Sequence, residues 1–246
     1  MFMKYQNIAI FGAPRSGTSW VGQMLNSSPN TLYRFQPLFS YEFKDCLSPT
    51  SGSREIREFH RKISDAKSDF VLTAYKFHKD KITHLVWKEV RHHHIVTNLI
   101  KNSDIKIIYI ERNPIHVINS WYNAPGEFKK EWDIESEWLN ASLKNNNMPE
   151  EFNGYNKWLE VRDIHTSNKK TYPDRVYSVT YEDLKVDPIL ELKKIYQFCK
   201  MPWSSQVENF IKETTSLHKD DPYGVHKTKN IEINLPRSII DKIKVP

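Results

Sequence analysis

One segment near the start of the chain combines residue types that bind phosphate groups. Residues 12–19 read GAPRSGTS and join a short apolar run to a stretch of helical spacing. Glycines let the backbone wrap an anion, and the N–H groups at the start of a helix point toward it. Arg15 adds a permanent cation, and Thr18 and Ser19 add hydroxyl donors. The segment therefore predicts an anion-binding loop.

The loop follows the P-loop pattern GxxxxGK plus Ser or Thr, except that Thr18 stands where the lysine belongs. Kinases and ATPases with a P-loop use that lysine together with Mg²⁺ to offset the charge of a triphosphate. A sulfuryl group carries less charge, so side-chain cations and backbone dipoles suffice for it. No acidic cluster accompanies the loop, and we expect no metal. A P-loop nucleotide kinase stays as an alternative, but the missing lysine argues against it.

A second segment places an arginine and a serine eight residues apart. Lys106–Glu111 (KIIYIE) is the strongest strand candidate, and Arg112 follows it directly. Asn113 and Pro114 then supply a helix cap and a proline at the first helical position. From there to Ser120 the helix rises about 9 Å, at ~1.5 Å per residue, and an arginine side chain spans much of that distance. We expect the arginine and the serine to bind one phosphate, as a forked donor and a hydroxyl donor.

Both segments lie at strand-to-helix junctions, and other parts of the chain have the same organisation. Short apolar runs alternate with stretches whose apolar residues recur at helical spacing. Such units predict a parallel sheet with helices on both faces, which binds ligands at the carboxyl ends of its strands. The expected class is a single P-loop-like α/β domain over residues 1–246. The predicted strands are residues 7–11, 84–88, 106–111 and 176–181, and the predicted helices contain residues 17–25, 95–100, 114–121 and 189–199.

The two loops together resemble the signatures of one enzyme family. PRSGTSW, followed later by RNP-x5-S, is similar to the 5′- and 3′-phosphosulfate-binding motifs of the sulfotransferases that use 3′-phosphoadenosine 5′-phosphosulfate (PAPS). Residues 177–203 resemble the later strand, turn and packing helix of that family, so the resemblance covers roughly residues 5 to 205. It implies transfer of a sulfuryl group from PAPS to a hydroxyl or an amine, with 3′,5′-ADP as the product.

The resemblance also implies a role for each motif residue. Trp20 would stack on or near the adenine, and Lys227, in a late loop, would reach the 3′-phosphate. Many cytosolic members carry lysine at the position of Arg15, whereas carbohydrate sulfotransferases carry arginine, which favours a saccharide or polysaccharide acceptor. Arg15 would also act at the leaving group. The 5′-phosphosulfate would be held by Arg15, Ser16, Gly17, Thr18 and Ser19, and the 3′-phosphate by Arg112 and Ser120.

The base that takes the acceptor proton is harder to assign. Carbohydrate members carry a glutamate–proline pair after the first helix, but this chain has Gln36 there, and an amide does not act as the base. Lys88 and Arg91 match the family's lysine-x-x-arginine, so Lys88 would place a second charge on the leaving phosphate. Glu89 adjoins it at a strand end and is the favoured base. The other candidates are Glu42, Asp45 and the histidines at 92–94.

Two further groups of side chains have competing interpretations. The consecutive histidines at 92–94 fan out rather than converge, so we expect no zinc site from them and place at least two at a solvated helix start. Trp121, Trp132 and Trp138 suit stacking on a sugar ring, although core positions would explain them equally well.

Composition and charge restrict the kinds of molecule that the chain is expected to bind. The formal net charge of +6 and isoelectric point near 9.1 favour a polyanionic partner. No arginine-rich arm or zinc finger appears, so nucleic acid is not expected. No stretch approaches the ~20 apolar residues of a membrane span, and Cys46 and Cys199 make no disulfide framework, so the expected setting is cytoplasmic. The remaining alternative is a non-catalytic relative that binds an anionic glycan or nucleic acid, because Gln36 replaces the family's base.

Overall fold

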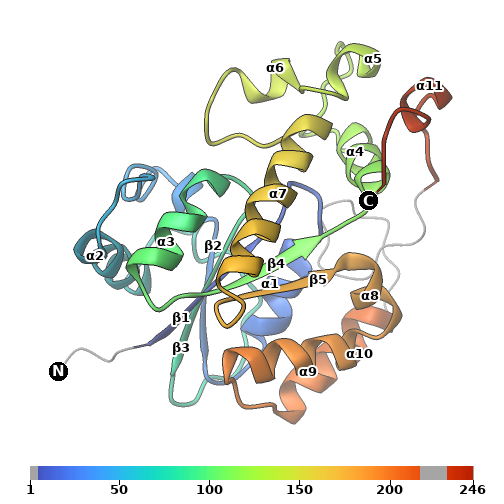
Figure 1. Ribbon diagram of the computed structural model, residues 1–246. Coiled ribbons are helices and arrows are strands. Elements are labelled where there is room, and N and C mark those ends of the chain that lie inside the picture. Colours follow the sequence, from blue (N-terminus) through green and yellow to red (C-terminus); the bar gives the residue numbers. More distant parts are fainter. Residues whose placement is uncertain (1–4, 217–231, 246) are drawn as a thin grey trace.

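The computed structural model describes residues 5–216 and 232–245. Within them, five strands form one sheet in the order β2-β3-β1-β4-β5, and every neighbouring pair is parallel (Figure 1). The central strand is apolar and buried on both faces, as parallel sheets covered by helices require. The strands are β1 (Gln6–Phe11), β2 (Thr31–Phe35), β3 (His84–Glu89), β4 (Lys106–Glu111) and β5 (Val176–Thr180).

The direction of chain progression reverses at β1. After β1 the chain passes to the edge strand β2 and returns through β3, and it then crosses β1 to reach β4 and β5. The register sets Phe11 beside Glu89 on one side and beside Tyr109 on the other. The loops that follow β1, β3 and β4 therefore open at the same edge, where sheets of this kind bind ligands.

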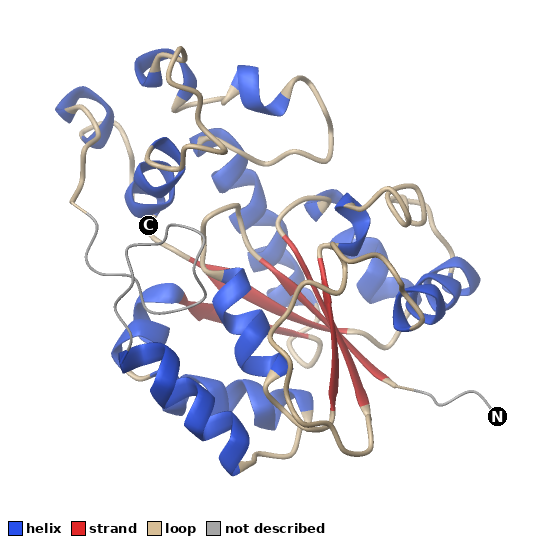
Figure 2. Cartoon of the chain, turned by 180° about the vertical axis from the view of Figure 1, so that it is seen from behind, coloured by secondary structure: helices blue, strands red, loops and turns tan. Residues whose placement is uncertain are grey.

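Helices cover both faces of the sheet (Figures 1 and 2). Successive strand residues alternate between the two faces, so Ile8 and Ile10 of β1 pack into one apolar cluster and Ala9 and Phe11 into another. The first layer contains α1 (Thr18–Asn26), α8 (Tyr181–Val186), α9 (Pro188–Cys199) and α10 (Ser205–Ser216). The second layer contains α2 (Ser53–Ser64), α3 (Val96–Asn102) and α7 (Tyr155–Thr171).

A third group of helices lies beyond the carboxyl end of β4, at the top of Figure 1. Most of its members share an apolar cluster that contains Trp121 and Trp138 together with Trp158 of α7. This cluster fixes the group beside the strand ends, so the group can contribute side chains to a site there. The helices are α4 (Pro114–Tyr122), α5 (Ile134–Glu137), α6 (Ser142–Asn145) and α11 (Arg237–Ile240).

The structure contains the α/β fold and the strands that the sequence predicts. The strand predicted at 106–111 coincides with β4, and the Asn113 cap is confirmed, because its side chain accepts a hydrogen bond from the N–H of Ile115 at 2.9 Å. The strand predicted at 176–181 ends one residue earlier, since Tyr181 already begins α8. The strand and helices that were not predicted are β2, α2, α5, α6, α7, α8, α10 and α11.

The helices and cysteines add two facts about the described residues. No helix within residues 5–216 and 232–245 is both long and apolar enough to cross a bilayer. Cys199 is buried, and burial raises the pKa of its thiol to about 12, whereas Cys46 is half-buried; neither forms a disulfide. Cys199 is therefore a packing group and not a nucleophile.

Candidate active site

The loop between β1 and α1 has the backbone of an anion-binding turn. Arg15 and Gly17 adopt left-handed conformations, with φ of 71° and 89°, and such residues occur in the backbone nests that bind anions. A Cβ at Gly17 would lie 2.5 Å from the ring of Tyr181, so the position requires glycine. Ser16 is buried, and its Oγ has no hydrogen-bond partner among the described residues. A buried hydroxyl in this state fits an anionic ligand.

The arginine that follows β4 lies against this loop. A terminal N–H of Arg112 donates to the carbonyl oxygen of Arg15 at 2.8 Å, and its guanidinium covers the ring of Tyr181 at 4.5 Å. Burial lowers the pKa of Arg112, and Tyr181 and Glu182 oppose that shift. Its Nε is buried and has no hydrogen-bond partner within the described part of the chain. Leaving such a donor unpaired is costly, and an anion would satisfy it.

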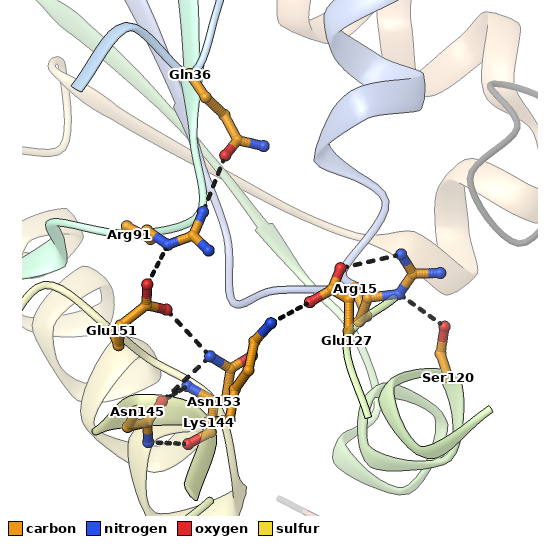
Figure 3. Close-up of polar contacts among 9 residues, drawn as sticks. All are labelled: Arg15, Gln36, Arg91, Ser120, Glu127, Lys144, Asn145, Glu151 and Asn153. Atoms are coloured by element: carbon orange, nitrogen blue, oxygen red, sulfur yellow. Dashed lines mark hydrogen bonds and ion pairs between the residues drawn. The ribbon is translucent and has the colours of Figure 1, made fainter. Parts of the chain in front are cut away.

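Ser120 joins the same cluster by contacting the other arginine. Arg15 Nε donates to Ser120 Oγ at 3.2 Å, although 105 positions separate the two residues (Figure 3). Helix α4 carries the serine to the loop because the helix begins directly at the end of β4. Arg15, Gly17, Arg112 and Ser120 all line one cleft. The structure thus brings the residues of the two predicted motifs together.

Lys88 reaches the cleft from the end of β3. It is buried, it lines the cleft together with Arg15, and its Nζ lies over the ring of Phe35 at 4.5 Å. Burial lowers the pKa of Lys88, and the carboxylate of the neighbouring Glu89 opposes that shift. A nearby anion favours the charged ammonium. Lys88 is therefore placed to respond to a phosphate group in the cleft.

Glu89 does not line the cleft, so its role as the base stays a prediction from the sequence. Adjacent strand residues point to opposite faces, so Glu89 faces away from Lys88. Its Oε1 accepts a hydrogen bond from the backbone N–H of Leu38 at 2.7 Å, and no part of the residue is exposed. Burial raises the pKa of the carboxyl group. Glu89 anchors the turn that follows β2, and this geometry does not suit proton transfer from an acceptor in the cleft.

Gln36 and Arg91 form another part of the cleft wall. Arg91 donates to Gln36 Oε1 at 3.2 Å, and its Nε forms an ion pair with Glu151 at 2.6 Å (Figure 3). The guanidinium of Arg91 also lies 3.9 Å from the ring centroid of Phe39. Arg91 thus differs from Lys88 in holding the wall together through several contacts, and the amide of Gln36 acts as one of its acceptors.

The cleft has a volume of about 660 Å³ and two chemically different parts. One part carries the cations described above. The other is aromatic: the ring of Phe70 meets Phe35 with centroids 5.5 Å apart and Phe39 with centroids 5.7 Å apart. Phe39 and Phe70 are also exposed. The first part suits a polyanion, and the second suits an apolar surface of another molecule.

Glu127 is a cleft residue that was not predicted from the sequence. Its Oε1 lies 3.5 Å from a terminal nitrogen of Arg15, and its Oε2 lies 3.7 Å from Nζ of Lys144 (Figure 3). Glu127 follows α4 and Lys144 belongs to α6, so the third group of helices brings both to the anion loop. No local pattern marks the position. Its proximity in sequence to the second motif is the signal that could have drawn attention to it.

Trp20 lines the cleft but is mainly a core residue. It is 3% exposed, its indole N–H donates to Thr214 at 3.4 Å, and its ring meets that of Tyr181 edge to face at 5.9 Å. Packing between α1 and α10 therefore holds the indole in place. Its stacking on adenine stays a prediction.

The histidine run lies at the start of a helical segment, and one of its three members is fully buried. His93 has no exposed surface, and its Nδ1 lies 3.0 Å from Nε2 of His165 in α7. His92 and His94 are half-buried. Burial lowers the pKa of all three imidazoles, which favours the neutral form that tolerates such packing. The run joins the end of β3 to α7.

Other expectations concern residues away from the cleft. Lys227 lies outside the described residues. Trp121 and Trp138 are buried in the apolar cluster beyond β4 and offer no face to a sugar. Within residues 5–216 and 232–245, no three histidine, cysteine, aspartate or glutamate side chains are grouped to hold a metal ion.

Known proteins are similar to this chain in sequence and in fold. The chain is 22% identical over 253 residues to an uncharacterized protein of Aquifex aeolicus, which covers 96% of this chain and 30% of that protein. It is 23% identical over 212 residues to cytosolic sulfotransferase 14 of Arabidopsis thaliana, which covers 82% of this chain and 56% of that protein. The crystal structure of mouse sulfotransferase SULT7A1 complexed with PAP has the same fold, with a TM-score of 0.55 and 17% identity over 86% of this chain and 65% of that chain.

Each match covers a larger share of this chain than of the relative. The chain spans less than two thirds of the length of each of these relatives. The model of the sulfotransferase domain family, however, matches residues 6–233, which include both anion-binding motifs. The resemblance carried by those motifs is confirmed, and the chain belongs to the sulfotransferase family.

Proposed function

We propose that this chain transfers a sulfuryl group from PAPS to a hydroxyl or an amine of an acceptor and leaves 3′,5′-ADP. The observation that carries the proposal is the meeting of the loop after β1 with the loop after β4. Arg15 contacts Ser120, and Arg112 contacts the backbone of Arg15, within one cleft. A nucleotide that carries anionic groups on both sides of its ribose requires two adjacent anion-binding loops.

The unsatisfied donors support a particular division of labour. Ser16 Oγ and Arg112 Nε, both buried, have no partners among the described residues. We assign the 5′-phosphosulfate to Arg15 and the loop residues after it, and the 3′-phosphate to Arg112 and Ser120. Lys227 remains a proposed ligand of the 3′-phosphate on the basis of sequence alone.

The cleft cations support the chemical step. Transfer breaks the bond between sulfur and the bridging oxygen, and negative charge develops on the 5′-phosphate. Arg15 and Lys88 line the cleft, where Lys88 is buried, and they offset that charge. In this proposal, the side chains of Arg15 and Lys88 take the place that the P-loop lysine and Mg²⁺ have in kinases.

For the acceptor we propose a saccharide that lays one apolar ring face on the aromatic part of the cleft. Phe39 and Phe70 offer exposed rings, and Arg91 lies beside Phe39. Aromatic faces bind the C–H face of a pyranose, while the hydroxyl groups at its edge stay free to react. A planar phenol would use the same wall, so both classes belong in the acceptor panel.

We also propose a cytoplasmic setting. Cys46 and Cys199 form no disulfide, which is typical of reducing compartments. The cations that we assign to the donor gather in a cleft of about 660 Å³, the size of a small-molecule site. This concentration of charge favours a nucleotide over a nucleic acid as the anionic partner.

The direct test is transfer of labelled sulfuryl from PAPS to a panel of glycans and phenols. We expect an acid-labile sulfate ester together with 3′,5′-ADP. We also expect 3′,5′-ADP to bind more tightly than ATP, with or without Mg²⁺. Tighter, Mg²⁺-dependent binding of ATP would favour a kinase, and glycan or nucleic-acid binding without transfer would favour the non-catalytic alternative.

A further inference from the structure

The acceptor proton needs a base inside the cleft, and few side chains qualify. Gln36 is an amide, and Glu89 is tied to Leu38 on the other face of the sheet. Glu42 and Asp45 are exposed and do not line the cleft. Among the described residues that line it, Glu127 is the one carboxylate, and none is a histidine. The carboxylate placed to act as the base therefore lies outside both phosphate-binding motifs.

The Glu127 carboxylate lies between two cations and forms a long ion pair with each of them. Its oxygens lie 3.5 Å from Arg15 and 3.7 Å from Lys144, distances longer than the roughly 2.7–3.2 Å of a hydrogen bond. Its side chain is 25% exposed. The carboxylate therefore keeps lone pairs for another donor while the two ion pairs restrict its position (Figure 3).

We infer that Glu127 accepts the proton of the acceptor hydroxyl, an inference that rests on the proposed sulfuryl transfer. As the acceptor oxygen bonds to sulfur, the bond from sulfur to the bridging oxygen breaks, and its electron pair stays on the 5′-phosphate beside Arg15 and Lys88. The proton passes to the Glu127 carboxylate and then to water. Arg15 lies between the leaving phosphate and the base, because it belongs to the anion loop and forms an ion pair with Glu127. Lys144 is a positioning residue for Glu127.

A purely structural role for Glu127 predicts different behaviour. If the carboxylate only held Arg15 in place, its loss would weaken nucleotide binding and turnover together. A base acts on the chemical step, so its loss lowers kcat and leaves nucleotide affinity nearly unchanged. It also leaves a mark on the pH dependence, because the acidic limb of the kcat profile reports the ionisation of the base.

The test compares Glu127→Gln with Glu131→Gln, an exposed glutamate in the same segment. The assay uses PAPS with the best acceptor of the glycan and phenol panel, and calorimetry with 3′,5′-ADP. For Glu127→Gln we expect kcat to fall about 100- to 10,000-fold and the acidic limb to disappear. The Kd for 3′,5′-ADP should change by less than about threefold. Glu131→Gln should leave both quantities unchanged.

Chemical rescue separates a base from a structural group. Added formate should restore part of the turnover of Glu127→Ala and should have no effect on Glu131→Ala. Unchanged turnover in Glu127→Gln, or a loss of 3′,5′-ADP affinity as large as the loss of turnover, would overturn the inference and leave the proposed function standing. A wild-type chain that transfers no sulfuryl group to any acceptor would overturn the proposed function, and the inference with it.

Discussion

Two buried donors without partners in the described part of the chain lie in the two loops that the motifs identify. Buried polar groups in folded proteins nearly always have hydrogen-bond partners, yet Ser16 Oγ and Arg112 Nε have none among the described residues. An anion that bridges these loops would satisfy both donors, and the cost of leaving them unpaired becomes part of the binding free energy.

Substitution of Arg112 tests the 3′-phosphate pocket. We expect Arg112→Ala to weaken 3′,5′-ADP binding by about 1.5–3 kcal/mol, the range for a hydrogen bond to a charged group. Binding of AMP, which lacks the 3′-phosphate, should change little. Calorimetry with both nucleotides measures the difference, with Arg57→Ala, at an exposed position of α2, as the control. Equal losses for the two nucleotides would remove Arg112 from the 3′-phosphate pocket.

Because burial lowers the pKa of Lys88, we expect the protein to take up protons when the nucleotide binds. Burial lowers that pKa from 10.5, so above the lowered pKa the amine is mostly neutral until an anion favours the ammonium. In that window the folded chain binds fewer protons than the unfolded chain, and the contribution of Lys88 to stability rises with pH. Calorimetry in buffers of different ionisation enthalpy, from about pH 6 to about pH 9, should show uptake that Lys88→Met abolishes. The same uptake in the variant would exclude Lys88 as its source.

At the scale of elements, the end of β3 serves two purposes through adjacent residues. Lys88 turns into the cleft, and Glu89 turns to the other face and accepts the N–H of Leu38 after β2. Because side chains alternate between the two faces of a strand, Lys88 faces the cleft and Glu89 supports the turn after β2. This division explains why sequence adjacency made Glu89 an attractive base and why the fold gives it another role.

The anchoring role of Glu89 has a measurable energetic consequence. Glu89→Ala removes the side-chain acceptor of a buried N–H, and we expect the free energy of unfolding to fall by about 1–3 kcal/mol. Glu89→Gln keeps an acceptor and should lose less. Urea unfolding measures both, and the affinity for 3′,5′-ADP should stay close to wild type. If Glu89→Gln instead abolished turnover at unchanged stability, Glu89 would regain the role of base.

Some elements with strong local signals, such as β4 and α4, were predicted, and β2, which depends on a distant partner, was not. β4 is a continuous apolar run, and Asn113 and Pro114 mark the following helix by chemistry confined to a few residues. β2 is a short edge strand that contains Arg34, and its pairing with β3 comes from residues far along the chain. The helix α2 did carry the signal, since Ile56, Phe59 and Ile63 recur at helical spacing.

At the scale of the whole molecule, topology completes the site. Arg112 donates to the carbonyl oxygen of Arg15 across 97 positions, and Arg15 donates to Ser120 across 105. Both contacts arise because β1 and β4 are neighbours in the sheet. The motif residues could be predicted because each loop has its own phosphate-binding chemistry. Glu127 and the aromatic wall could not, because they acquire a role only when α4, α6 and the turn after β2 converge on the cleft.

Because the ligand would join loops from separate parts of the chain, its binding should appear in global stability. A ligand specific for the folded state, present at 100 times its Kd, stabilises that state by about 2.7 kcal/mol. A loss of 1.5–3 kcal/mol in Arg112→Ala raises Kd by about 13- to 160-fold, so the same 3′,5′-ADP concentration should stabilise that variant by only about 0.3–1.3 kcal/mol. Denaturant unfolding with and without 3′,5′-ADP measures both values. Equal stabilisation of the two proteins would mean that the nucleotide does not use the loop after β4, and the two-loop site would be wrong.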